Sequence, residues 1–323
     1  MDDVTRTRDS ASAAPTVNAP KRVMLLVNRY SRSGGNGIAP AIERLEKAGV
    51  HVFVETAGSP GEMGSDIVRR ASEADAIMVG GGDGTLNAAA PGIVETGLPL
   101  AILPLGTAND LARTLGVPSD PVAAAELLLT GNTRRIDLGY VNDHPFFNVA
   151  SIGLSVELAD ALTPVLKRRW GRLSYALAGF KVMTRARPFR AWIAEEEHAD
   201  WQKVRTYQVA IGNGRHYGGG IVVEEEAQID DATLNLYSLE VRGVLRLALL
   251  AGAFQSGRQG LWREVRTAKG KSFLLRTRKP RQINADGEIV GETPAHFRVD
   301  PGVITVFAPP PGEVRPNPAY KAR

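Results

Sequence analysis

A glycine-rich segment from Gly80 to Asn87 follows a short apolar run and precedes an alanine-rich helical pattern. Glycines let a backbone approach a phosphate closely because they have no Cβ atom. A helix that begins there offers unpaired N–H groups and the positive end of its dipole, and both attract anions. Asp83 lies within the segment, where a carboxylate would repel phosphates unless a metal ion or water lay between them. The segment therefore predicts a nucleotide site with Mg²⁺ or a water network. A tight turn capped by Thr85 is the structural alternative, but three consecutive glycines exceed what a cap needs.

The segment from Pro104 to Asp110 carries similar chemical groups after another apolar run. It offers the hydroxyl of Thr107, the amide of Asn109 and the carboxylate of Asp110. Thr107 or Asn109 could simply cap the following helix, but with Asp83 on a neighbouring strand end the groups form a constellation. Rossmann and P-loop sites are disfavoured because no acidic residue ends the next strand and no Gly-Lys-Ser/Thr occurs.

Two late carboxylates, Asp286 and Glu288, are separated by one glycine. Both can face a cleft, and their mutual repulsion would raise one pKa toward a value suited to proton transfer. Taken alone, Asp286-Gly287 is also a common hairpin turn. The five histidines are scattered without ligand spacing, so a zinc site is not expected.

The composition is that of a two-domain globular protein without disulfides. The chain has 323 residues and no cysteine, which excludes thiolate catalysis and cysteine-based metal sites. Its net charge of +4 indicates a mild preference for anionic partners. We expect residues 1–20 to be a disordered tail. The longest apolar helical stretch, 244–254, is too short to span a bilayer, so we expect a cytoplasmic protein whose membrane contact is peripheral.

The first half alternates strand and helix patterns, which predicts a mainly parallel sheet with helices on both faces. Ligands of such sheets bind at the carboxyl ends of the strands, and the three glycine-bearing loops all follow strands. The expected strands are 22–27, 50–54, 76–79 and 100–103, and the expected helices are 38–48, 62–71 and one that ends near 94.

After residue 120 the pattern changes to strands without intervening helices, which favours an antiparallel, sandwich-like arrangement. We therefore predict an α/β nucleotide-binding domain over 21–132 and a β-rich domain over 133–309, with a cleft at their seam. The tail 310–323 is expected to pack back on the first domain. The expected elements are a helix at 121–129, helical insertions at 155–186 and 241–259, and strands at 136–141, 146–150, 189–194, 204–212, 233–239, 272–276 and 303–308.

Together these motifs resemble the diacylglycerol kinase catalytic-domain family of bacterial lipid kinases, which is related to sphingosine and ceramide kinases. NAD kinases and phosphofructokinases resemble the first loop alone, so the later motifs make the resemblance specific. It covers about 21–309 and rests on 28–35, which is similar to an Asn-Pro-x-Ser-Gly loop, and on 81–87, 104–110, 135–139, 212–220, 230–231 and 286–288.

The resemblance implies transfer of the γ-phosphoryl group of ATP to a lipid hydroxyl, with diacylglycerol or another long-chain lipid as acceptor. Such a transfer needs alignment, charge neutralisation and a proton acceptor. Glu288 is the implied general base, with Asp286 beside it, and Mg²⁺ with its waters is assigned to Asp83, Asp110 and Asp137. The residues implied to hold the nucleotide are Asn28, Arg29, Tyr30, Thr56, Gly81, Gly82, Asp83, Gly84, Thr85, Leu86, Asn87, Thr107 and Asn109.

A structural Mg²⁺ ion is implied in the second domain at Gln228, Asp231 and Thr233. The chain departs from the family there because Ala232 replaces the usual glycine. If that glycine served a left-handed backbone conformation, the site would be distorted. Arg29 in place of proline and Ala88 in place of glutamate are two further departures, which we interpret as tuning.

A basic and aromatic cluster at 167–172 is followed by Arg185, Arg187 and Arg190. Anionic membranes attract such clusters, although a solvated helix face is the plain alternative. We expect a lipid substrate at the membrane surface and no nucleic acid, because no recognised module is present. A NAD-kinase-like enzyme and a catalytically weak lipid-binding or regulatory protein are the alternatives. The sequence names neither the acceptor lipid nor the oligomeric state.

Overall fold

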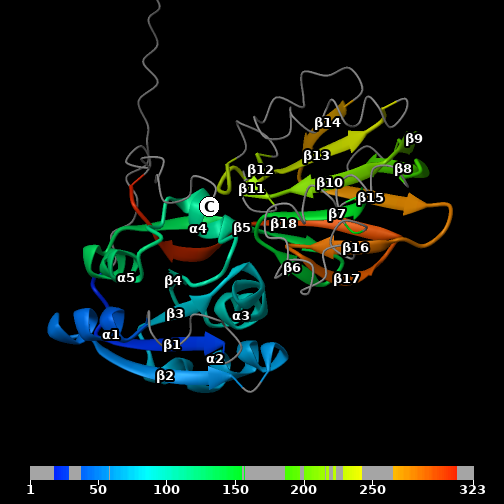
Figure 1. Ribbon diagram of the computed structural model, residues 1–323. Helices are drawn as coiled ribbons and strands as arrows, with labels where there is room; N and C mark the ends of the chain where they lie inside the picture. Colours follow the sequence, from blue (N-terminus) through cyan, green and yellow to red (C-terminus); the bar gives the residue numbers. More distant parts are fainter. Residues whose placement is uncertain are drawn as a thin grey trace, which may run out of the picture.

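A computed structural model describes residues 18–28, 38–57, 59–154, 156, 186–196, 200–214, 216–217, 221–222, 228–241 and 265–310. Its strands form a ten-stranded sheet, a six-stranded sheet and a two-stranded ribbon. The α/β half occupies the lower left of Figure 1 and the β-rich half the upper right. The predicted helical insertions and the tail 310–323 lie almost wholly outside the described residues.

Four parallel strands form the first part of the ten-stranded sheet, in the order β2-β1-β3-β4. Because crossover connections are right-handed, this order puts α1 on one face and α2 and α3 on the other. The contacts agree, since α1 packs on α5 and α2 packs on α3. The strands are β1 (Arg22–Asn28), β2 (His51–Ala57), β3 (Ala76–Gly81) and β4 (Leu100–Pro104), and the helices are α1 (Ile38–Lys47), α2 (Met63–Arg70), α3 (Asp83–Thr96), α4 (Asp110–Leu115) and α5 (Pro121–Thr130).

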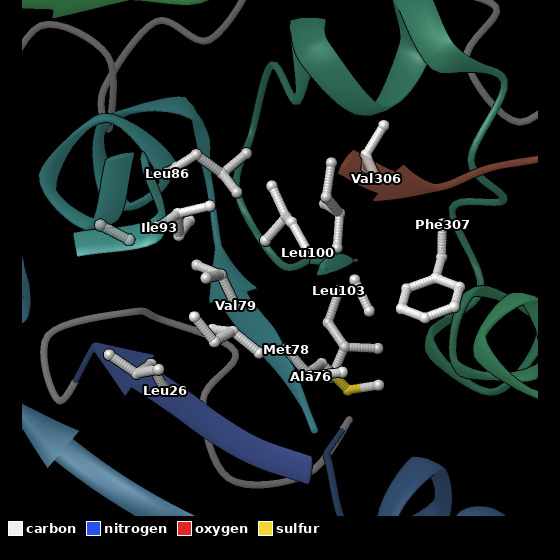
Figure 2. Close-up of a cluster of buried hydrophobic side chains, with 14 of the residues drawn as sticks. Leu26, Ala76, Met78, Val79, Leu86, Ile93, Leu100, Leu103, Val306 and Phe307 are labelled. Atoms are coloured by element: carbon white, nitrogen blue, oxygen red, sulfur yellow. The ribbon is translucent and has the colours of Figure 1, made fainter. Parts of the chain in front are cut away.

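The core of this half lies between the sheet and its helices, as Figure 2 shows. All six residues of β3 are buried, as expected for a strand that is covered on both faces. Leu86 and Ile93 of α3 face Val79 in this cluster. The start of α3, where the glycine segment ends, is therefore held firmly against the sheet.

The same sheet continues into the second half of the chain. The long last strand β18 (Ala295–Phe307) pairs with β4 at Val306 and Leu100, and it also pairs with β5 and β15. One end of β18 contributes Val306 and Phe307 to the core of the first half, while the other contributes Phe297 to the core of the second. The further strands of this sheet are β5 (Thr133–Val141), β6 (His144–Phe146), β8 (Phe189–Glu195), β9 (Gln202–Thr206) and β15 (Ser272–Thr277).

An antiparallel six-stranded sheet faces this extension, in the order β14-β13-β10-β7-β16-β17. Side chains of both sheets form one core, which contains Phe273 from one sheet and Ile152 from the other. The predicted sandwich-like arrangement is thereby confirmed. The remaining strands are β7 (Val149–Gly153), β10 (Gln208–Gly212), β13 (Leu234–Leu239), β14 (Val265–Gly270), β16 (Gln282–Ala285) and β17 (Glu288–Glu292), with β11 (His216–Tyr217) and β12 (Ile221–Val222) as the ribbon.

The strand predicted at 204–212 is wrong, because the structure divides it between the two sheets. The chain turns at Tyr207, so that β9 ends in the large sheet and β10 begins in the six-stranded one. The hydroxyl of Thr206 holds the turn by donating to the carbonyl oxygens of Gln208 and Leu239, at 2.7 and 3.0 Å. The predictions also missed β14, β16, β17 and the first half of β18. Within the described residues, no helix has both the length and the apolar character that crossing a bilayer requires.

Candidate active site

The glycine segment forms the end of β3 and the start of α3. Gly82 is the N-cap residue of α3, and no side chain caps this helix. Thr85 is buried, and its backbone N–H donates to the carbonyl oxygen of Gly82 at 3.0 Å. The sequence alternative of a Thr85 cap is therefore wrong. The first N–H groups of α3 have no side-chain cap, which is the arrangement that attracts a phosphate.

The loop after β4 packs directly on the loop after β3. Leu105 donates its N–H to the carbonyl oxygen of Gly81 at 3.0 Å. A Cβ atom on Gly106 would lie only 2.5 Å from the Cα atom of Gly82, so the close packing requires glycine. Asn109, in the left-handed region at φ 50°, closes this loop by accepting from the N–H of Gly106 and donating to two carbonyl oxygens. Its side chain thus builds the loop.

Asp83 links the two loops through the start of α4. Its two carboxylate oxygens accept hydrogen bonds from the backbone N–H groups of Asp110 and Leu111, at 3.1 and 3.0 Å. Each oxygen keeps a second lone pair. This geometry fits a metal ion held through water better than one bound directly to Asp83, and Mg²⁺ commonly keeps several waters.

The late acidic motif forms the turn between β16 and β17. Asp286 and Gly287 have φ values of 45° and 101°, as a two-residue hairpin turn requires. The hairpin interpretation of this motif is therefore correct. Glu288 is the first residue of β17, and its side chain is exposed.

The carboxylate of Asp286 binds three consecutive backbone N–H groups. Phe147, Asn148 and Val149 donate to it at distances from 2.7 to 3.2 Å. Burial raises the pKa of Asp286 to about 6, with a further contribution from the charge of Asp83, and the N–H donors oppose the rise. The rise in pKa was predicted from repulsion between the two late carboxylates, but its causes are burial and Asp83.

The hairpin tip reaches across to α3. Asn87 donates to a carboxylate oxygen of Asp286 at 3.2 Å, although 199 residues separate them. A Cβ atom on Gly84 would lie 2.9 Å from Oε1 of Glu288, so the carboxylate of Glu288 lies against the first turn of α3. The structure thus brings Asp83, Gly84, Asn87, Asp286 and Glu288 to one place.

Asp137 binds backbone groups of two later segments of the chain. Its carboxylate accepts from the N–H groups of Ala232 and Gly302, each at 2.7 Å. Burial raises its pKa, and the neighbouring charges of Asp231 and Asp230 raise it further. The structure groups Asp137 with these aspartates, and this geometry does not support the prediction that it shares a metal ion with Asp83 and Asp110.

The residues predicted to hold a structural metal do not fit a cation as they are arranged. One carboxylate oxygen of Asp231 accepts from the N–H and hydroxyl of Thr233, and the other lies 2.8 Å from Nζ of Lys269. A cation at Asp231 would have to displace that ammonium group. Ala232 adopts φ 58°, so the chain keeps the left-handed conformation without glycine. In the described part of the chain, no group of three or more His, Asp or Glu residues could hold a metal ion.

For the other described residues predicted to hold the nucleotide, the structure gives a position but no contact that indicates a role. Thr107 is exposed beside Gly106, and Thr56 is exposed on β2, paired with Val27 of β1. The side chain of Leu86 packs in the core, so only its backbone could contact a nucleotide (Figure 2). Asn28 ends β1. Several predicted residues lie outside the described part of the chain. They are Arg29, Tyr30, Arg185, the cluster at 167–172 and the segment 223–227 that precedes Gln228.

Sequence reasoning missed Asn213 as a site-building residue. Its side-chain amide is fully buried and donates to the carbonyl oxygens of Asp137 and Phe147, at 3.0 and 3.1 Å. It therefore fixes the segment that Asp286 binds. Asn213 belongs to the glycine-rich motif at 212–220, which the sequence analysis recognised. The sequence alone did not indicate that its side chain would be buried and would bind two backbone carbonyl groups.

Comparison with family models matches nearly the whole described chain. Residues 22–141 match the model described as diacylglycerol kinase catalytic domain. Residues 148–308 match the model described as YegS C-terminal NAD kinase beta sandwich-like domain. The two matches meet between residues 141 and 148.

Similar proteins and structures agree with these matches. A Pseudomonas aeruginosa protein named lipid kinase YegS-like is 33% identical over 305 residues, covering 90% of this chain and 95% of its own. A diacylglycerol kinase of Staphylococcus epidermidis is 28% identical, covering 83% and 85%. The crystal structure of a candidate diacylglycerol kinase from Bacillus anthracis is 26% identical with a TM-score of 0.77, covering 94% of this chain and 99% of that chain.

Proposed function

We propose that this chain, which belongs to the lipid kinase family that carries the diacylglycerol kinase catalytic domain, transfers the γ-phosphoryl group of ATP to the hydroxyl of diacylglycerol or a related long-chain lipid. The observation that carries the proposal is the meeting of the late acidic hairpin with the start of α3. On this proposal the start of α3 supplies the phosphate site and the hairpin supplies the proton acceptor, although 199 residues separate Asn87 from Asp286.

The donor half of the reaction uses the backbone at the start of α3. Its uncapped N–H groups and helix dipole favour the phosphates of ATP. Mg²⁺ bound with the nucleotide would neutralise phosphate charge, and Asp83 would hold it through water. Asp83 also holds the start of α4 next to this phosphate site through its two hydrogen bonds.

The acceptor half uses Glu288 as the general base. Its exposed carboxylate beside Gly84 can accept the hydroxyl proton while the hydroxyl oxygen attacks the γ-phosphorus and ADP departs. Asp286 positions Glu288, because its hydrogen bonds tie the hairpin tip both to Asn87 and to residues 147–149. A displacement of about 1 Å at such a site can reduce the rate about a hundredfold.

The test is transfer of label from γ-labelled ATP to lipid, with diacylglycerol, ceramide and monoacylglycerol offered in mixed micelles and NAD offered in solution. We expect label in diacylglycerol and a loss of at least about a hundredfold in kcat for Glu288→Gln. The matched control is Glu292→Gln, because Glu292 is also exposed and lies at the other end of β17.

Two results would overturn the proposal. Label that enters NAD but no lipid would assign the chain to a NAD-kinase-like activity. Vesicle binding without any consumption of ATP would instead support the regulatory alternative. Full activity of Glu288→Gln would overturn the base assignment while leaving the enzyme class intact.

A further inference from the structure

The outward side chains of three neighbouring strands form a basic and aromatic face on the β-rich half. On β8 and β9 the residues alternate between the sandwich core and solvent, so that every second side chain points outward. Arg276 of β15 extends the same face. We call it the basic–aromatic face, and it consists of Arg190, Trp192, Trp201, Lys203, Arg205 and Arg276.

The strand register places the cations of this face side by side. Arg190 lies opposite Arg205, and Trp192 lies between Lys203 and Arg276. Like charges directly opposite each other destabilise a sheet, so folding stability does not account for the Arg190 and Arg205 pair. The juxtaposition of these two arginines instead favours an anionic partner that is absent from the isolated chain.

No carboxylate neutralises these cations within the described residues. The arginines of the first half differ, since Arg22 pairs with Asp75 at 2.7 Å and Arg44 pairs with Glu126 at 2.7 Å. The guanidinium of Arg276 instead lies 4.2 Å from the centre of the Trp201 ring and 5.7 Å from that of Trp192. These cations therefore have no ion pair among the described residues, and the exposed carboxylates of Glu196 and Asp200 border the face where the chain passes from β8 to β9.

The tryptophans determine what kind of anionic partner fits. Trp201 is 39% exposed beside the edge strand β9, and its ring is held by stacking against Arg276. Exposed tryptophan among lysine and arginine is the combination found where proteins meet the headgroup region of a bilayer. We propose that the basic–aromatic face docks on the surface of an anionic phospholipid bilayer. This deepens the proposed function, on which it rests, because a lipid kinase must meet its substrate at a membrane.

Binding is tested without ATP or diacylglycerol, by flotation of the full chain with vesicles. One vesicle set is pure phosphatidylcholine, and the other is equimolar phosphatidylcholine and phosphatidylglycerol. We expect binding to the anionic set alone. The double variant Arg190→Gln, Arg205→Gln should bind about thirtyfold more weakly, because each cation near an anionic surface contributes about a fivefold increase in binding. Brominated lipid should quench the fluorescence of the wild type more than that of Trp201→Phe.

The matched control removes two cations from the first half. Arg44→Gln with Lys47→Gln changes the net charge equally, and both residues lie on the exposed side of α1. We expect this control to bind like the wild type. An equal loss in both double variants would overturn the proposal in favour of attraction by net charge. Absence of wild-type binding, or displacement of bound protein from vesicles by a single-stranded oligonucleotide that binds the same face, would also overturn it.

Kinase activity separates this inference from the proposed function. Phosphorylation of a short-chain diacylglycerol in detergent needs no bilayer, so the Arg190 and Arg205 variant should act on it at the wild-type rate. If no lipid is phosphorylated but vesicle binding depends on the face, the kinase proposal fails and the docking surface stands. If the variant loses detergent activity without losing thermal stability, the face is not a separate docking surface.

Discussion

Asp286 is a carboxylate enclosed by the protein, and its ionisation should appear in the stability of the fold. Its pKa is raised from 3.8 to about 6. Between these values the folded state holds a proton that the unfolded state has lost, so stability falls as the pH rises from about 4 to about 6 and then levels off. Chemical denaturation at several pH values should show this fall in the wild type.

The matched comparison is Asp286→Asn, which cannot ionise. Its amide group would place N–H donors against the N–H groups of residues 147–149, so we expect it to be less stable at every pH. The difference between the two proteins should shrink as the pH rises through about 6. Parallel stability curves would show that Asp286 has an ordinary pKa.

At the scale of the element, the first turn of α3 and the late hairpin are fitted to each other. A methyl group at Gly84 would meet Oε1 of Glu288 at 2.9 Å, at the free end of a flexible side chain. Gly84→Ala should therefore displace this carboxylate, with a loss of about tenfold to a hundredfold in kcat and little change in Tm.

Gly61→Ala is the control for that substitution, because a Cβ atom there meets nothing within 4 Å. It should retain both activity and Tm. If Gly84→Ala raised the KM for ATP while kcat was unchanged, the methyl group would be obstructing the phosphates, and the contact with Glu288 would have no catalytic importance.

The ammonium group of Lys269 binds Asp231 in the loop before β13. Because Lys269 already pairs with Asp231, we expect a chelator to leave the Tm of the wild type unchanged. Lys269→Met should lose up to about 1 kcal/mol of unfolding free energy, since the pair is partly exposed. Mg²⁺ should restore little of that loss, because Arg134 already pairs with Asp230 at 2.6 Å and two backbone N–H groups already occupy Asp137.

Lys271→Met is the matched control for the ammonium group, because Lys271 is exposed and joins β14 to β15. Its Tm should not respond to Mg²⁺. A wild-type Tm that falls on chelation would mean that a metal ion displaces Lys269 in solution.

The helices and strands were predictable where the hydrophobic pattern is regular and glycine-rich loops mark the ends of the strands. They were less predictable in the rest of the chain. The repeated strand and helix signals of the first half give β1 to β4 almost as observed. The break at Tyr207 was not predictable, because no glycine, proline or other turn residue marks it and the turn depends on a tertiary bond from Thr206 to Leu239. The grouping of Asp137 with Asp230 was hidden for a similar reason, since it depends on where distant strands pack.

At the scale of the whole molecule, the two halves share one sheet and should unfold together. All four tryptophans, Trp170, Trp192, Trp201 and Trp262, lie in the second half. Ile77 is fully buried in the core of the first half, so Ile77→Ala should cost about 2–5 kcal/mol. We expect tryptophan fluorescence to report the full decrease in Tm, in step with circular dichroism. A fluorescence transition unchanged from the wild type would show that the halves unfold independently.

The position of β18 in the chain has a consequence for synthesis on the ribosome. The edge of β4 is covered by Val306, which is among the last residues that the structure describes. Until translation reaches that point, the nearly complete first half exposes an unpaired strand edge and lacks Phe307 from its core. The nascent chain must therefore reach Val306 before the half made first can close, and this interval is when it is most exposed to aggregation and chaperone capture.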